Sequence, residues 1–127
     1  MVVDNPPRPL DPPLDPAAAD RVFHALADPT RRDILMTTLR AEHSVSALAR
    51  RYPMSFAAVQ KHVAVLEQAA LVTKERRGRE QLVRGDVETI RRAAGLLDEL
   101  EALWRGRMAR IADLLDSHPP SEGDRTP

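Results

Sequence analysis

Proline interrupts helices and interior strands, and this 127-residue chain carries its eleven prolines almost entirely at its two ends. Six of them fall within the first 16 residues and three within the last nine. Only Pro29 and Pro53 lie between these two groups. The sequence therefore predicts one folded body over residues 16–117, preceded by a Pro-rich disordered tail at 1–15 and followed by a flexible tail at 118–127.

Four helix-start signals divide the first part of this body. Each is a side chain that can cap a helix, and the four are Asp15, Asp28, Ser44 and Ser55. Both aspartates precede a proline, which suits the first helical position. With the apolar spacing that follows each cap, these signals predict helices over 16–27, 29–40, 45–52 and 55–69. The short connection at 53–55 is typical of a helix-turn-helix.

Beyond residue 70 the apolar period changes. Residues 71–76 and 80–84 flank a turn at Gly78, which can adopt a positive φ, so they predict a two-stranded hairpin. After a capping Asp86, apolar residues recur at helical spacing and predict a long final helix that ends near residue 117. The expected fold class is mainly α, a winged helix-turn-helix in the order α-α-α-α-β-β-α with a long C-terminal dimerisation helix.

The net charge of the whole chain argues against a nucleic-acid-binding protein, whereas the distribution of charge along the chain favours one. Nineteen Lys and Arg residues meet nineteen Asp and Glu residues, so the net charge is zero. Two basic residues against five acidic ones in 1–30 give −3, eleven against five in 31–84 give +6, and six against nine in 85–127 give −3. The positive segment contains the helix-turn-helix and the hairpin, where it can neutralise phosphates.

The exposed face of the fourth helix suggests what it reads. Its buried stripe is expected to be Val59, Val63 and Leu66. The second helix of a helix-turn-helix places its N-terminal residues in the major groove, and here the candidates for base readout are Ser55, Phe56, Gln60 and Lys61. Gln60 suits adenine, and Lys61 suits guanine or a phosphate. Phe56 has two open interpretations, contact with a thymine methyl group or packing against the second helix.

Basic side chains surround the tip of the hairpin, where the sequence offers no apolar side chain to pack. The candidates for contact with the DNA backbone are Lys74, Arg76, Arg77 and Arg79, with Arg50, Arg51 and His62 as further candidates. His62 lies beside the buried stripe, so a core histidine is the alternative interpretation. Arg31, Arg32 and Arg40 on the second helix are expected to face water.

Three stretches resemble one known family. Residues 23–35, FHALADPTRRDIL, look like the opening of ArsR-type winged-helix repressors, and residues 54–63, MSFAAVQKHV, with 66–72, LEQAALV, are similar to that family's recognition helix and its exit. The match covers most of 20–116. It implies a homodimeric DNA-binding transcriptional repressor whose first and last helices form the dimer interface. The candidate interface residues are Val22, Phe23, Leu97, Leu100, Trp104, Met108, Ile111 and Leu115.

The chain departs from the metal-sensing members of that family. Ser44-Val45-Ser46 stands where arsenic sensors carry Cys-Val-Cys, and the chain has no cysteine at all. Hydroxyl groups do not replace soft thiolate ligands at neutral pH. Another site of the family uses carboxylates and histidines of the last helix, and this chain offers Asp98, Glu101, Asp113, Asp116 and His118 without the expected spacing. The sequence thus predicts no metal and no cofactor, with a metal-responsive repressor as an alternative.

Other function classes find little support in the sequence. The chain has no glycine-rich phosphate loop and no evident nucleophile–base pair, so an enzyme is not expected. No stretch approaches the length of about 18 apolar residues that spans a membrane, and the N-terminus does not resemble a signal peptide. The expectation is a cytoplasmic homodimer that binds an inverted repeat in double-stranded DNA. A protein-interaction module on a winged-helix scaffold is the alternative.

Overall fold

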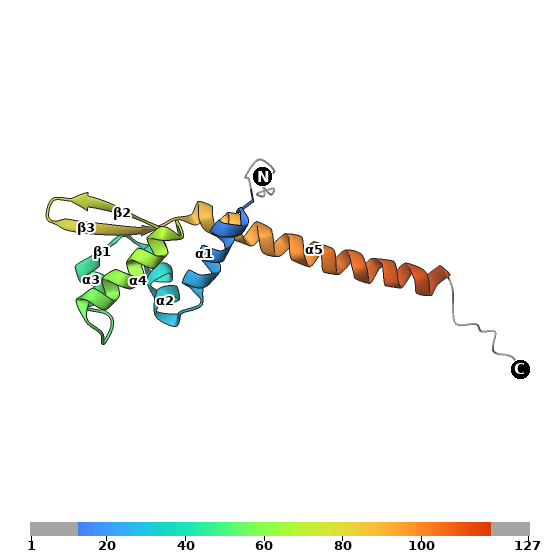
Figure 1. Ribbon diagram of the computed structural model, residues 1–127, viewed down its shortest axis with the longest axis horizontal. Helices are drawn as coiled ribbons and strands as arrows, with labels where there is room; N and C mark the ends of the chain where they lie inside the picture. The colour runs from blue at the N-terminus through green and yellow to red at the C-terminus, as the bar shows by residue number, and fades with distance from the viewer. Residues whose placement is uncertain (1–12, 118–127) are drawn as a thin grey trace, which may run out of the picture. The chain divides into compact units, whose positions relative to one another are not determined.

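The computed structural model describes residues 13–117, and the Cα positions divide the chain into two compact units, Met1–Ala94 and Gly95–Pro127. The elements follow the order α1 (Pro16–Leu26), α2 (Pro29–Arg40), β1 (His43–Ser44), α3 (Val45–Ala49), α4 (Phe56–Gln68), β2 (Val72–Arg77), β3 (Glu80–Gly85) and α5 (Val87–Ser117) (Figure 1). The helix α5 begins in the first unit and supplies all of the described part of the second. The predicted tails lie largely outside the described residues. No helix of the described part is long and apolar enough to cross a membrane.

The four caps predicted for the first part of the body are confirmed, and Oδ1 of Asp86, the cap predicted for the last helix, accepts the N–H of Glu88 at 2.9 Å. The side chains of Asp15, Asp28, Ser44 and Ser55 accept hydrogen bonds from the backbone N–H groups three residues further on, at 2.8–3.0 Å. The bounds of α1, α2 and α4 match the prediction within a residue. The helix α3 is shorter than predicted and ends at Ala49, because the chain tightens there into a turn in which the Arg51 N–H bonds to the carbonyl of Leu48.

The sheet has three strands rather than the predicted two. The hairpin β2–β3 is confirmed, with Arg77 opposite Glu80 across a two-residue turn and a φ of 64° at Gly78. The strand β1 pairs antiparallel with β3, which gives the order β1-β3-β2. The strand β1 is only two residues long, which is too short to show an alternation of polar and apolar residues, so the sequence did not predict it.

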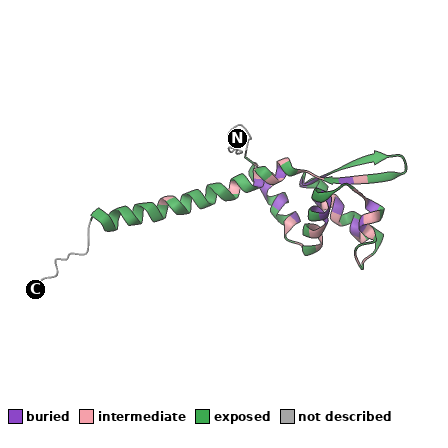
Figure 2. Cartoon of the chain, turned by 180° about the vertical axis from the view of Figure 1, so that it is seen from behind, coloured by how far each residue is buried: buried purple, intermediate pink, exposed green. Residues whose placement is uncertain are grey.

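The core of the first unit joins the helices to the sheet. The predicted stripe of Val59, Val63 and Leu66 is buried, and α1, α2, α3 and both hairpin strands contribute further buried apolar residues. Figure 2 shows the buried positions gathered in these elements, whereas α5 beyond Ala94 is almost entirely exposed. The recognition helix is therefore held along one side only, which leaves its opposite side available.

At the C-terminal end of α4, an alanine occupies a position where glycine is usual. Leu71 N–H bonds to the Leu66 carbonyl and Ala70 N–H to the Glu67 carbonyl, both at 2.9 Å, which is the Schellman arrangement. This motif needs a left-handed residue at the position after the cap, and that residue is Ala70, with a φ of 62°. Glycine usually occupies this position because a Cβ atom is strained there.

Replacing Ala70 by glycine should therefore stabilise the protein. We expect the free energy of unfolding to rise by about 1 kcal/mol, since relief of the left-handed strain exceeds the entropy that glycine adds to the unfolded chain. Urea unfolding at a fixed protein concentration measures this change. Ala64→Gly, at a half-buried position in the interior of α4, is the control and should destabilise by about 0.5–1 kcal/mol. Equal losses in both variants would contradict the assignment.

Candidate nucleic-acid interface

The N-terminal half of α4 carries the predicted readout residues on its exposed side. Phe56, Gln60 and Lys61 are exposed, with Phe56 at 46%. Ser55 is exposed too, and its Oγ accepts the N–H of Ala58 at 3.0 Å as the helix cap. Its hydroxyl hydrogen remains able to donate to a base or a phosphate. The structure brings these four residues together at one helix end.

A groove joins this helix end to the hairpin. It has a volume of about 160 Å³, and its walls come from α3, α4, β2, β3 and the turn between the two strands, with the lining residues Val45, Ser46, Phe56, Gln60, Val63, Lys74, Arg79, Glu80 and Gln81. Phe56 thus borders a groove that faces the hairpin. Two of the candidate base-reading residues, Phe56 and Gln60, thus line the same groove as two candidate backbone-binding residues, Lys74 and Arg79.

The register of the hairpin separates its basic residues into two faces. Lys74 stands opposite the buried Val83, and Arg76 stands opposite Gln81. Side chains alternate along a strand, so Lys74 and Arg76 share the face that borders the groove. Arg77, one position further, belongs to the opposite face. We call the first the groove face and the second the outer face.

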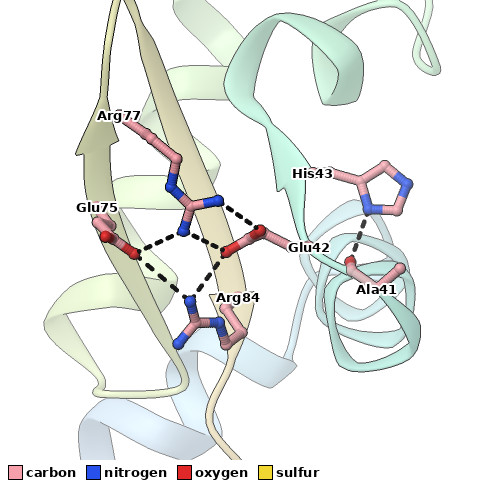
Figure 3. A network of polar contacts seen from close by, with 6 residues as sticks. All are labelled: Ala41, Glu42, His43, Glu75, Arg77 and Arg84. Atoms are coloured by element: carbon pink, nitrogen blue, oxygen red, sulfur yellow. Dashed lines mark hydrogen bonds and ion pairs between the residues drawn. The ribbon is translucent and has the colours of Figure 1, made fainter.

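On the outer face, the positive charges of the arginines are neutralised by ion pairs with glutamates of the same chain. Two arginines and two glutamates form a connected network, made of Glu42, Glu75, Arg77 and Arg84 (Figure 3). Arg77 contacts Glu42 at 3.3 Å and Glu75 at 3.1 Å, and Arg84 contacts Glu42 at 2.9 Å. Hydrogen bonding from Arg84 and the nearby guanidinium charges lower the pKa of Glu42, and the hydrogen bond to Glu75 and the charge of Glu42 raise the pKa of Arg77.

On the groove face more of the positive charge stays available. Arg76 donates from Nε to the carbonyl of Gly78 at 3.2 Å, which leaves the two terminal nitrogens of its guanidinium. Within the described residues Arg79 has no ion-pair partner, whereas Lys74 lies 3.3 Å from Glu67. The backbone-binding residues predicted from the sequence therefore differ in how free their charges are, a difference that the sequence did not reveal.

His62 lies on the side of α4 that faces the rest of the domain. Its Nδ1 is 3.3 Å from Nη1 of Arg31 and 4.0 Å from the carboxylate of Asp28. Arg31 also donates to the carbonyls of Ala25 and His24, so it connects the end of α1 to α4. The prediction that Arg31 faces water is therefore wrong, because these carbonyls hold it against the domain. The placement of His62 agrees with the alternative of a histidine packed within the fold.

The loop between α3 and α4 carries the remaining basic candidates. Arg50 and Arg51 are exposed there. The hydroxyl of Tyr52 donates to Asp33 of α2 at 2.6 Å, which fixes this loop to the second helix. Burial, together with that carboxylate, raises the pKa of Tyr52, so the hydroxyl stays a donor at neutral pH.

The second unit presents a long apolar stripe. The predicted interface residues of α5 are all exposed in the single chain, and Leu103 and Leu114 extend the apolar surface. The exposed fraction of Trp104 is 56%. On α1, Phe23 is also exposed, but Val22 is fully buried in the core of its own domain. Val22 is therefore not available to a partner, because its side chain already packs inside the first unit.

Comparison with known proteins agrees with this geometry. A family model described as a helix-turn-helix domain matches residues 26–75. The HTH-type transcriptional regulator Rv2034 of Mycobacterium tuberculosis is 36% identical over 107 residues, which cover 84% of this chain and 94% of that protein. An ArsR-like transcriptional regulator from Rhodococcus sp. RHA1 is 37% identical, with a TM-score of 0.70 over 77% of this chain and 92% of that one. This chain belongs to the ArsR-type family of winged helix-turn-helix regulators.

A third relative bears on assembly. The solution structure of Mb0332 from Mycobacterium bovis is described as a homodimeric winged helix-turn-helix DNA-binding domain. It is 27% identical to this chain, with a TM-score of 0.56 over 68% of this chain and 80% of that one. The ArsR-type regulator described here is accordingly a DNA-binding transcriptional regulator, and its relatives are regulators rather than enzymes.

Sequence reasoning on this ArsR-type regulator missed Glu42. Glu75 and Arg77 are two residues apart on one strand, which is a local sign that they share a face. Glu42 joins them only through the pairing of β1 with β3, which had no signal in the sequence. In the described residues 13–117 no group of three or more candidate ligands could hold a metal ion. His118, one of the residues considered for such a site, lies outside the described part.

Proposed function

We propose that this ArsR-family regulator is a cytoplasmic homodimeric repressor that binds an inverted-repeat operator in double-stranded DNA. Residues 16–117 carry both DNA binding and dimerisation. The observation that carries the proposal is the groove, which Phe56 and Gln60 of α4 line together with Lys74 and Arg79 of the hairpin. A single DNA duplex lying against that surface meets a base-reading helix and a backbone-binding hairpin together.

The proposed base-reading residues are Ser55, Phe56, Gln60 and Lys61, and the proposed backbone contacts are Lys74, Arg76, Arg79, Arg50 and Arg51. Arg77 is left out, because Glu42 and Glu75 already hold its guanidinium. His62 is left out because it faces Arg31. The resemblance to ArsR-type repressors supports the repressor role, and the homodimeric relative supports the assembly. The exposed stripe of α5 offers the apolar surface that a dimer needs, and Phe23 is an exposed apolar residue of the first unit.

The direct test is to sequence DNA fragments selected by the purified protein. We expect an inverted repeat with half-sites about 34–36 Å apart, one turn of DNA, because the two recognition helices of a dimer enter successive major grooves. Selection of an asymmetric single site would contradict the dimer model. No binding to any duplex at low salt would leave the protein-interaction module instead.

One variant tests the readout residues. Gln60→Ala should lose discrimination at one base pair of each half-site, by about 1–3 kcal/mol, since glutamine can make two hydrogen bonds to adenine. Competition binding with operators mutated one base pair at a time measures this loss. Gln68→Ala is the control, because Gln68 is exposed at the far end of α4 and should leave the preference unchanged. If Gln60→Ala weakened all sequences equally, Gln60 would be a backbone contact.

A further inference from the structure

Glu42 contacts both arginines on the outer face of the hairpin. It lies between α2 and β1 (Figure 3). Its Oε1 accepts from Nη1 of Arg77 at 3.3 Å, and its Oε2 accepts from Nη2 of Arg77 at 3.4 Å and from Nη2 of Arg84 at 2.9 Å. Glu42 therefore holds Arg77 through both terminal nitrogens of its guanidinium.

The second carboxylate of the network completes the neutralisation. Glu75 lies 3.1 Å from Nη2 of Arg77 and 3.5 Å from Nη2 of Arg84. The outer face thus carries two positive and two negative charges in mutual contact. On the groove face, Arg76 and Arg79 have no such partners in the described part of the chain. The hairpin therefore offers its unpaired positive charge on one side only.

We propose that Glu42 is a specificity-determining residue that withholds Arg77 and Arg84 from the DNA backbone. Contacts with phosphates carry no sequence information, and the affinity for random DNA grows with the number of phosphates that a protein neutralises. Two further arginines on the hairpin would therefore strengthen binding to every sequence. Glu42 lowers that background, so the ratio of operator binding to random binding rises.

This inference rests on the proposed function, because it concerns the hairpin as the backbone-binding element. The chain as a whole has no net charge. Its affinity for random DNA therefore depends on the local charges of the hairpin and the helix-turn-helix rather than on the total charge. Under these conditions a single carboxylate at the hairpin has a measurable influence on the salt dependence of binding.

The test is the variant Glu42→Gln, which keeps the shape of the side chain and removes its charge. Its affinity for a random duplex should rise by roughly 3- to 10-fold at low salt as arginines gain phosphate contacts. Each new contact adds about 0.9 to the slope of log affinity against log salt, so the ratio of affinities at about 50 and about 200 mM salt should grow by about 3.5-fold for each new contact. Fluorescence anisotropy at several salt concentrations measures both quantities.

Two further variants separate release of the arginines from a general change of charge. Asp20→Asn changes the net charge equally at an exposed position on α1, outside the network of the outer face, so it releases no arginine and should raise the affinity less than about twofold. Arg77→Gln should weaken random binding on the order of 3-fold in the Glu42→Gln background, and by less in the wild-type background, where Glu42 and Glu75 hold the guanidinium. Thermal unfolding of each variant checks that it is folded.

The results decide between the possibilities. A gain in Glu42→Gln no larger than that of Asp20→Asn would overturn the proposal, as would an equal effect of Arg77→Gln in both backgrounds. Weaker binding by Glu42→Gln would show that the network serves to support the hairpin, which also contradicts the proposal. If the wild-type protein binds no duplex at low salt, the proposed function fails first; if it binds and the variants do not differ, only this inference fails.

Discussion

Replacing Trp104 by glutamate should separate the proposed homodimer into monomers and lower the affinity for the proposed two-half-site operator by about a hundredfold or more. The wild-type side chain is large, apolar and exposed in the single chain. Large aromatic residues at the centre of an interface commonly dominate its stability. A glutamate at that place would bury an unpaired charge, which adds to the loss of apolar contact.

The position of Trp104 on its helix makes it the best single target. Successive residues of a helix are separated by about 100° around the axis, so residues spaced by three, four and seven share a side. The predicted interface residues of the second unit lie on one side of α5 by this spacing, namely Leu97, Leu100, Trp104, Met108, Ile111 and Leu115. Trp104 stands near the middle of this stripe. The prediction therefore tests the whole surface through one residue.

Sedimentation analysis at micromolar concentration and binding to the intact operator and to a single half-site measure the effect. The monomeric variant should bind the intact operator no better than one half-site, because the second binding event has lost its link to the first. Ala102→Glu is the matched control, since it introduces the same charge at an exposed position nearly opposite Trp104 on the helix. A Trp104→Glu protein that stays dimeric would place the interface elsewhere.

Features of this fold that depend on neighbours in sequence were predictable. Each of the four caps of α1 to α4 is a side chain that accepts a hydrogen bond from the N–H three residues later, so the residue type alone indicates where a helix starts. The turn at Gly78 follows from the same kind of local preference. The order of elements and the exposed face of α4 followed from these signals, and with them most of the candidate base-reading site.

Features that depend on contacts between distant segments were not predictable. The strand β1 exists because His43 and Ser44 pair with Val83 and Leu82, far along the chain. Arg31 looked like a surface residue by helical spacing, but its guanidinium bonds to carbonyls at the end of α1 and to His62 of α4. A long, flexible, charged side chain has many possible partners, and only the tertiary structure selects among them.

The distribution of charge is another feature that the sequence predicted only in part. Splitting the sequence assigned the positive charge correctly to the segment 31–84, which holds the helix-turn-helix and the hairpin. Within that segment, Arg76, Arg77 and Arg79 were all predicted to contact the DNA backbone. In the structure, however, Arg77 forms ion pairs with two glutamates. Summed charge thus indicates a candidate DNA-binding region, but the contacts of individual side chains decide which charges are available to phosphates.

Leu66→Ala should cause the largest loss of stability among the variants considered, about 2–5 kcal/mol of the free energy of unfolding. Leu66 is fully buried on α4, and its carbonyl accepts the N–H of Leu71 in the motif that ends the helix. Both side chains belong to the core, where a Schellman motif usually places an apolar contact between these two positions. Removing the leucine side chain leaves a cavity at the junction of the recognition helix and the hairpin.

Urea unfolding at a fixed protomer concentration measures this loss, because the stability of a dimer depends on concentration. The midpoint should fall while the slope stays constant, which separates a loss of stability from a change in the unfolded state. Gln68→Ala, two residues further and exposed, should change the free energy by no more than about 0.5 kcal/mol. A loss below about 1 kcal/mol in Leu66→Ala would mean that the core collapses around the missing side chain, and that the end of α4 tolerates a change of shape where the hairpin begins.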